Sequence, residues 1–219
     1  MEINVVQKVM KVNDDLAQGV RERLTAARIA CLNFMSAPGS GKTTLIEVAL
    51  RALDGKPAIG VIEGDPDTTL DAERIAACGA PVVQVNTAGG CHLEANLVSH
   101  ALDRFDLDRL DILIIENVGN LVCPVDFDLG ENRRVAVVST TEGHDKPAKY
   151  PKLFRTADLV VLNKIDLLPH VDFDAVFFRD TVQKLKPGVE ILEVSCRNGE
   201  GVDAWASWIR GAAAAGDKG

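Results

Sequence analysis

The sequence predicts an α/β fold in which helices cover both faces of a doubly wound, largely parallel sheet. Three apolar runs, at residues 29–35, 111–118 and 158–162, have the composition of strands that are buried on both sides. Segments with helical periodicity lie between such runs, and each run ends in a polar or glycine-bearing turn. Because α/β proteins bind ligands at the carboxyl ends of parallel strands, these turns are the candidate functional sites.

The composition is that of an ordinary soluble domain. The 219 residues are 47% hydrophobic and 26% charged, and the net charge of −8 argues against nucleic acid or an anionic membrane as the main partner. No apolar run reaches the roughly 18 residues of a membrane span, and no signal peptide precedes the first charges. The five cysteines, unevenly spaced, suggest cytosolic thiols or metal ligands. The expected compartment is therefore the cytoplasm.

Residues 1–28 are predicted to form an amphipathic helix that packs on the domain. Apolar residues recur there at mostly helical spacing, with charges between them: Val5, Val9, Val12, Leu16, Val20 and Leu24. A partner could also cover this face, but simple packing is the favoured interpretation.

The first apolar run leads into Ser36-Ala-Pro-Gly-Ser-Gly-Lys-Thr-Thr44, the strand–loop–helix context of a phosphate-binding P-loop. Gly39 and Gly41 let backbone N–H groups converge on an anion at the start of a helix. Lys42 would reach the β- and γ-phosphates, and the Thr43 hydroxyl would hold Mg²⁺. One departure is Ser36, which occupies the usual position of the first glycine. The expected nucleotide-binding residues here are Pro38, Gly39, Ser40, Gly41, Lys42, Thr43 and Thr44.

An acidic loop follows the next strand, predicted at residues 58–62. Glu63, Asp65 and Asp67 come within five residues, broken by Gly and Pro. Asp65 is the first choice for Mg²⁺ coordination or for alignment of the attacking water. The alternative is a solvated loop in which Asp67 or Thr68 caps the following helix, and both interpretations can hold together.

The strand predicted at residues 81–85 leads to Cys91 and His92, which lie at or just before a helix expected over residues 93–104. At that position the helix dipole favours a thiolate. The apolar run at residues 111–118 carries Glu116 near its end and Gly119 just after it, a pattern that resembles a Walker B element with a γ-phosphate-sensing glycine. Lys42, Asp65, Glu116 and Gly119 are therefore the candidate catalytic residues, and Thr43, Asp65 and Glu116 the candidate Mg²⁺ ligands.

A strand at residues 134–139, a helix to about residue 156 and a strand at residues 158–162 precede Asn163-Lys-Ile-Asp166. This is an N-K-x-D turn about 120 residues after a P-loop. The Asp166 carboxylate can accept two hydrogen bonds from guanine, whereas adenine would leave a buried acceptor unpaired. Asn163 and Lys164 would flank the base. A last strand at residues 190–194 delivers a loop that could cover the base, with Ser195, Cys196 and Arg197.

No repeat or linker divides the chain. The predicted organisation is a P-loop GTPase domain over residues 29–212 and a flexible tail over residues 213–219.

Together these motifs identify the chain as similar to the HypB family, GTPases of the SIMIBI class that assist nickel insertion into [NiFe]-hydrogenase. The resemblance rests on S-A-P-G-S-G-K-T-T-L, V-I-E-G-D, Q-V-N-T-x-x-G-C-H-L-E-A, I-E-N-V-G-N-L-V-C-P, E-G-x-D-K-P-x-K-Y-P, L-N-K-I-D-L-L-P and S-x-x-x-G-E-G, from residue 29 to residue 208. It implies GTP and Mg²⁺ binding, slow GTP hydrolysis to GDP, and a homodimer promoted by GTP and metal. The implied partners are other hydrogenase maturation proteins and the hydrogenase large-subunit precursor.

The resemblance also implies a Ni²⁺ or Zn²⁺ site formed by Cys91, His92 and Cys123. Thiolate–imidazole sets suit both ions, but three ligands leave the shell incomplete, so water or a second subunit must supply the rest. From the residues alone, these cysteines could equally be small loop or core residues. The family's N-terminal cysteine motif and histidine-rich stretch do not occur in these 219 residues, which leaves the site inside the GTPase domain.

Two other functions are alternatives to hydrogenase maturation. A nickel GTPase serving urease would be expected to have His where this chain has Val125, after the Cys-Pro pair. A regulatory GTP switch without a metal role would not need the Cys91, His92 and Cys123 set.

Overall fold

The computed structural model describes residues 5–65 and 67–216, with side chains for residues 10–65 and 67–214. In this part of the chain seven strands form one sheet: β1 (Ala30–Ser36), β2 (Ile59–Asp65), β3 (Val82–Asn86), β4 (Ile112–Glu116), β5 (Arg133–Ser139), β6 (Leu159–Asn163) and β7 (Glu190–Val194). The helices are α1 (Val5–Ala26), α2 (Lys42–Leu53), α3 (Leu70–Ala77), α4 (Ala95–Leu102), α5 (Cys123–Asp126), α6 (Lys146–Lys149), α7 (Pro151–Thr156), α8 (Ala175–Leu185) and α9 (Val202–Gly216). Short 3₁₀ turns lie at Leu107–Arg109, Thr140–Glu142 and Ile165–His170.

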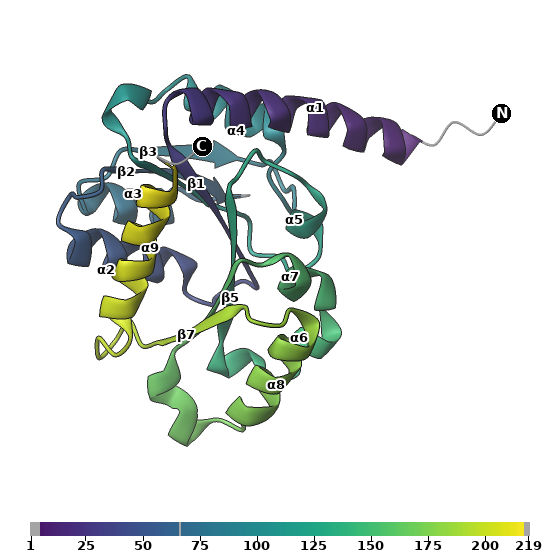
Figure 1. The fold of residues 1–219 in the computed structure, drawn as a ribbon, viewed down its shortest axis with the longest axis vertical. Helices are drawn as coiled ribbons and strands as arrows, with labels where there is room; N and C mark the ends of the chain where they lie inside the picture. Colours follow the sequence, from purple (N-terminus) through teal and green to yellow (C-terminus); the bar gives the residue numbers. More distant parts are fainter. Residues whose placement is uncertain (1–4, 66, 217–219) are drawn as a thin grey trace.

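The strand order is β3-β2-β4-β1-β5-β6-β7, and all neighbouring pairs are parallel. β1 therefore lies at the centre, and the chain leaves it toward β2 on one side and later returns to β5 on the other. Apolar side chains of α2, α3 and α9 pack on one face, where Leu45, Ile75 and Trp205 are fully buried. Side chains of α1, α4, α7 and α8 pack on the other (Figure 1). The predicted doubly wound fold is confirmed.

The N-terminal helix packs differently from the prediction. Of the predicted stripe, Val20 and Leu24 are buried, but Val12 is 59% exposed and Leu16 41% exposed, while Asn13 and Ala17 face the core. The side chains of Val5 and Val9 lie outside the described residues. The N-terminal end of α1 extends beyond the sheet (Figure 1), and from Asn13 onward the buried side of the helix is the one that carries Asn13, Ala17, Val20 and Leu24.

Other boundaries differ by a few residues. The helix expected up to residue 156 is divided into α6 and α7 at Tyr150, because Pro151 disfavours helical dihedrals at the residue before it. α9 continues to Gly216, so residues 213–216 of the predicted tail are helical, and residues 217–219 lie outside the described residues. Among the described residues, no helix combines the length and apolar content needed to cross a membrane.

Candidate functional site

The P-loop connects β1 to α2, and its glycines have the backbone that the motif requires. Gly39 and Gly41 have φ of 74° and 93°, in the left-handed region that favours glycine. A Cβ on Gly41 would lie 2.6 Å from Asn163 Nδ2, so no other residue fits there. The loop amides are thus held at the N-terminus of α2, where an anion is favoured.

Ser36, the departure from the usual motif, holds the P-loop lysine. The Lys42 ammonium donates a hydrogen bond to Ser36 Oγ at 2.8 Å, and both side chains are buried. Burial lowers the pKa of Lys42, while Glu116 and other carboxylates oppose this effect. Ser36 therefore stabilises the charged form of Lys42 at the position where the ammonium would contact a phosphate. The sequence did not predict this role for Ser36.

Two buried carboxylates lie beside the P-loop. Glu63 and Glu116 are in register on the adjacent strands β2 and β4, and both are less than 5% exposed. Thr43 Oγ1 donates to Glu116 Oε1 at 2.8 Å. The Oε2 atoms of both glutamates are buried without a hydrogen-bond partner among the described residues. Burial raises the pKa of Glu63 to about 8 and that of Glu116 to about 7. Such orphaned oxygens suit a hard cation such as Mg²⁺.

Asp65 has a structural task of its own. Its Oδ1 accepts hydrogen bonds from the backbone N–H groups of Asp67 and Thr68 at 2.7 and 2.6 Å. The residue preceding α3 is Thr69, so the predicted capping by Asp67 or Thr68 is wrong. One ligand atom from each of Glu63, Asp65 and Asp71 lies within 4.8 Å of the others. The Mg²⁺ interpretation of the acidic loop therefore remains compatible with its geometry, whereas the capping interpretation does not.

A cavity of about 480 Å³ collects these groups. Its wall includes the P-loop, the acidic loop and the end of β4: Pro38, Gly39, Ser40, Gly41, Lys42, Thr43, Thr44, Glu63, Gly64, Asp65, Asp71, Arg74, Glu116, Asn117, Val118, Gly119 and Lys164. Gly119 lies so close to the P-loop that a Cβ on it would be 2.9 Å from Pro38 Cα. The predicted sensing glycine therefore lies directly against the phosphate loop.

A second cavity of about 380 Å³ adjoins the first, and both are lined by Gly41, Thr44 and Lys164. Asp166, Leu167, Cys196 and Arg197 line its outer part. Lys164 Nζ donates to the carbonyl of Gly39 at 2.8 Å, and Asn163 Nδ2 donates to that of Ser40 at 2.9 Å. The N-K-x-D turn thus stabilises the P-loop as well as lining a space for a base.

Ser195 lies behind this cavity and does not line it. It is fully buried, and its hydroxyl donates to Asp166 Oδ1 at 2.7 Å. We therefore correct its expected role: Ser195 orients the carboxylate, and it does not contact the cavity itself.

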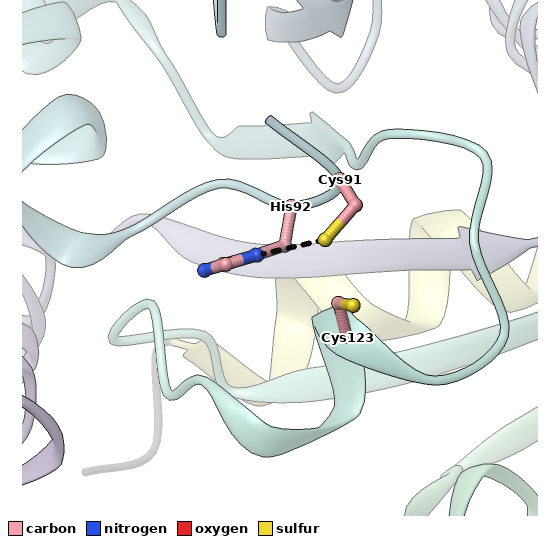
Figure 2. A group of neighbouring side chains, drawn as sticks. All are labelled: Cys91, His92 and Cys123. Carbon is pink, nitrogen blue, oxygen red and sulfur yellow. Dashed lines mark hydrogen bonds between the residues drawn. The ribbon is translucent and has the colours of Figure 1, made fainter. Parts of the chain in front are cut away.

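The predicted metal ligands come together at the same edge of the sheet. Figure 2 shows Cys91 and His92 on the segment after β3, next to Cys123 at the start of α5. Cys91 Sγ lies 3.5 Å from His92 Nδ1, and one ligand atom from each residue lies within 4.8 Å of the others. Ligands that share one ion at about 2.0–2.3 Å can be no more than about 4.6 Å apart, so only a small approach is needed.

The surroundings of the cluster favour a metal-binding imidazole. The His92 ring stacks on Phe127 with centroids 3.9 Å apart, and burial lowers the pKa of His92 despite nearby Glu94. A neutral imidazole is the form that binds metal. A hydrogen bond shared with Cys91, and then burial, raises the pKa of the Cys123 thiol. α4 begins only at Ala95, so Cys91 is outside its first turn and the predicted dipole effect is wrong.

The structure adds three residues that the sequence analysis did not select. Glu63 was part of the predicted acidic loop, where Asp65 was preferred, while Asp71 and Arg74 were not singled out. Arg74 forms ion pairs with Asp71 and Glu47 and donates to Thr44 Oγ1 at 3.0 Å. The only sequence signal for a role of Asp71 and Arg74 in the site was their position on α3, the helix after the acidic loop.

Comparisons with known proteins give one family. The nucleotide-binding domain described as CobW/HypB/UreG matches residues 31–193. The hydrogenase maturation factor HypB of Azotobacter vinelandii is 48% identical over 94% of this chain and 68% of its own length. HypB of Archaeoglobus fulgidus superposes with a TM-score of 0.87 at 40% identity, covering 93% of this chain and 99% of that one. HypB of Helicobacter pylori, solved in complex with nickel, superposes with a TM-score of 0.88 at 36% identity, covering 93% of this chain and 95% of that one.

The parallel sheet, the P-loop after β1 and the N-K-x-D turn after β6 define a P-loop nucleotide-binding protein. Within that class, the chain belongs to the HypB family of hydrogenase maturation factors. This confirms the resemblance that the motifs predicted.

Proposed function

We propose that the protein binds and slowly hydrolyses GTP and assists nickel insertion into a [NiFe]-hydrogenase precursor, with a metal site coupled to the nucleotide state. One observation carries the proposal: the Cys91, His92 and Cys123 cluster lies at the same sheet edge as the phosphate cavity, and only three residues separate Gly119 from Cys123. A purely regulatory GTP switch has no need of such a cluster.

Guanine selectivity follows from Asp166. This carboxylate lines the second cavity, and the Ser195 hydroxyl donates a hydrogen bond to its Oδ1 from the protein interior. Guanine offers it N1–H and the 2-amino group, whereas adenine offers a lone pair at N1 and no 2-amino group. An unpaired buried acceptor costs at least about 1 kcal/mol, so GTP and GDP are favoured over ATP and ADP.

Hydrolysis depends on the phosphate cavity. Lys42 supplies a positive charge for the β- and γ-phosphates. Gly119 lies against the P-loop, where a bound γ-phosphate can move its backbone. Thr43, Glu116 and Asp65 would hold Mg²⁺, which neutralises charge on the phosphates. Glu63, with its unpaired oxygen, lies in the same wall and adds a fourth candidate.

The cluster would take Ni²⁺ or Zn²⁺ as cargo, and the nickel complex of the Helicobacter pylori relative supports nickel. Three ligands are one short of a tetrahedral or square-planar shell. The same cluster of a second copy, across a two-fold axis, could supply the missing ligand, which would link metal binding to a homodimer. The cytoplasm is the proposed compartment, with other maturation proteins and the hydrogenase large-subunit precursor as partners.

The test compares GTP hydrolysis and Ni²⁺ stoichiometry in matched variants. Lys42→Ala, which removes the charge partner of the phosphates, and Thr43→Ala, which removes an expected Mg²⁺ ligand, should each abolish turnover, while both variants still bind Ni²⁺. Cys91→Ala and Cys123→Ala should lower Ni²⁺ stoichiometry and leave GDP affinity within about threefold. Cys31→Ser or Cys78→Ser serves as the thiol control. Full Ni²⁺ binding by both cluster variants would favour the regulatory switch instead.

A further inference from the structure

A buried amide joins the two sites. Asn117 directly follows β4 and is 1% exposed. Its Oδ1 accepts hydrogen bonds from the backbone N–H of Leu93 at 3.2 Å and from that of Val118 at 3.0 Å. Leu93 is the residue after His92, and Val118 is the residue before Gly119. One side-chain oxygen thus connects the metal-binding segment to the segment that contacts the P-loop.

The side chain of Leu93 makes a second connection. Leu93 is fully buried, and a Cβ on Gly64 would lie only 2.8 Å from its Cδ1 and 2.9 Å from its Cγ. Gly64 separates Glu63 from Asp65 in the acidic loop. The residue next to His92 therefore packs directly on the backbone between two carboxylates of the phosphate cavity.

The other end of Asn117 is anchored in the sheet. Its Nδ2 donates to Asn33 Oδ1 at 3.3 Å, and Asn33 Nδ2 donates to Glu131 Oε1 at 3.3 Å. Arg134 holds the same Glu131 oxygen at 2.6 Å. The Asn117 side chain is therefore held in place by the central strands. If Val118 shifts, the distance from its N–H to Asn117 Oδ1 changes, and the N–H of Leu93 uses the same oxygen.

We propose that Asn117 and Leu93 are the positioning residues that couple the phosphate cavity to the Cys91–His92 segment. The inference rests on the proposed function, which supplies the two ligands, and adds the route between them. A γ-phosphate that moves Gly119 also moves Val118. Since buried amides and carbonyls have no water to replace a lost partner, Leu93 must follow Val118 or leave a group unpaired. Metal binding at His92 acts on Asn117 by the same contacts in reverse, as linkage requires.

The first experiment measures the Ni²⁺ dissociation constant of the full chain with Mg²⁺–GDP and with a Mg²⁺-bound non-hydrolysable GTP analogue. The wild-type constants are expected to differ at least about fivefold, the lower end of ordinary allosteric coupling. In Asn117→Ala the two Ni²⁺ constants should agree within about twofold, each measured at a nucleotide concentration that saturates the variant, because Asn117 also lines the phosphate cavity. The control is Asn132→Ala, which removes another side-chain amide whose Oδ1 accepts a backbone N–H, that of Cys31 at 2.7 Å. Asn132 lines neither cavity and is not part of the metal cluster, so this variant should keep the wild-type ratio.

A second measurement needs no bound metal. Exchange of GDP for the analogue should shift the backbone amide signals of Cys91, His92 and Leu93 in the wild type, and not in Asn117→Ala. Gly64→Ala provides a variant independent of Asn117: its methyl group must displace Leu93 and shift the same signals in the GDP state. Adding Leu93→Ala should return the signals of Cys91 and His92 toward their wild-type positions.

The outcomes separate the two proposals. Equal Ni²⁺ constants in the wild type would overturn both the coupling in the proposed function and this route. A wild-type ratio that persists in Asn117→Ala would overturn the route alone. Equal loss of the ratio in Asn132→Ala would also overturn it, since the loss of any such amide would then have the same effect.

Discussion

Asp166 has a hydrogen-bond donor on its interior side and the cavity proposed for the base on its other side. Ser195 donates to Oδ1 from the protein interior, and the same carboxylate lines the cavity proposed for the base. A carboxylate held in this way presents its remaining acceptor sites in a fixed direction, so recognition depends on residue identity and on orientation. Ser195 controls the second of these without contacting the cavity.

For Asp166→Asn, we expect GDP affinity to fall at least tenfold and xanthosine diphosphate to bind better than GDP, because the amide replaces one acceptor with a donor. Ser195→Ala should weaken GDP binding less, by about three- to tenfold, since the charge remains and only its orientation is lost. Fluorescent nucleotide titration measures both variants. Equal affinity of the unmodified protein for ATP and GTP would contradict the base assignment.

The Glu63 and Glu116 carboxyls are the second feature at this scale. Their pKa values are about 8 and about 7 in the folded protein, against 4.5 as the ordinary value. Between about pH 4.5 and pH 8 the folded protein therefore holds protons that the unfolded chain has already released. The free energy of unfolding must fall as pH rises through this window, by up to about 1.4 kcal/mol per pH unit for each proton.

Urea denaturation in EDTA without nucleotide, from pH 5 to pH 8.5, measures this slope. Glu63→Gln is expected to reduce the slope, since the amide does not titrate, and to raise the free energy of unfolding near pH 8. Glu73→Gln is the control because this side chain is exposed on α3 outside the cavity. Identical slopes for the wild type and Glu63→Gln would mean that Glu63 ionises normally in the folded state.

At the scale of elements, α1 acts through a polar contact. Asn13 is 5% exposed, its Nδ2 donates to the carbonyl of Asp128 at 2.8 Å, and its Oδ1 accepts from the N–H of Ala95 at 2.9 Å. Ala95 is the first residue of α4, so Asn13 satisfies an N–H that the helix itself leaves without a partner. Through Asn13, α1 holds the start of the helix that follows the metal-binding segment.

Asn13→Ala is expected to lower the free energy of unfolding by about 1–3 kcal/mol, because two buried backbone groups lose their partner. Val12→Ala, on the exposed side of the same turn, should change it by less than about 0.5 kcal/mol. Chemical denaturation of both variants gives the comparison. A smaller effect for Asn13→Ala than for Val12→Ala would show that water replaces both contacts.

For the whole molecule, the parallel arrangement brings every candidate site to one edge. Because neighbouring strands all run in the same direction, the turns after β1, β2, β3, β4 and β6 lie at the same end of the sheet. The phosphate cavity and the Cys91, His92 and Cys123 cluster share that edge. A second copy that completes the metal shell would therefore approach the face that also responds to nucleotide.

We expect Ni²⁺ and a GTP analogue each to shift the monomer–dimer equilibrium toward the dimer, and to do so more strongly together than alone. Sedimentation equilibrium with GDP, with the analogue and without nucleotide measures the shift, each with and without Ni²⁺. Cys123→Ala should lose the effect of Ni²⁺ and keep that of the analogue, and Cys78→Ser should keep both. The same mass under all conditions would show that a second copy does not supply a ligand to the metal.

The family resemblance implied the grouping of Cys91, His92 and Cys123, whereas the sequence by itself determined the fold class, the P-loop and the N-K-x-D turn. These features could be predicted because strand burial, glycine dihedrals and motif spacing are local properties of the chain. The positions of the motifs at strand ends then follow from the rule that parallel strands end at one edge.

Only the tertiary structure decided which side chains meet across the sheet. β2 pairs with β4 and β4 with β1, although none of these pairs is consecutive in the chain, and this order brings Glu63 beside Glu116 and Asn33 beside Asn117. Asp65 turned its carboxylate toward its own loop, Ser195 lies behind Asp166, and Asn13 took a core position expected for an apolar residue. Each outcome depends on which backbone groups need a buried hydrogen-bond partner, and that requirement arises only when distant segments pack together.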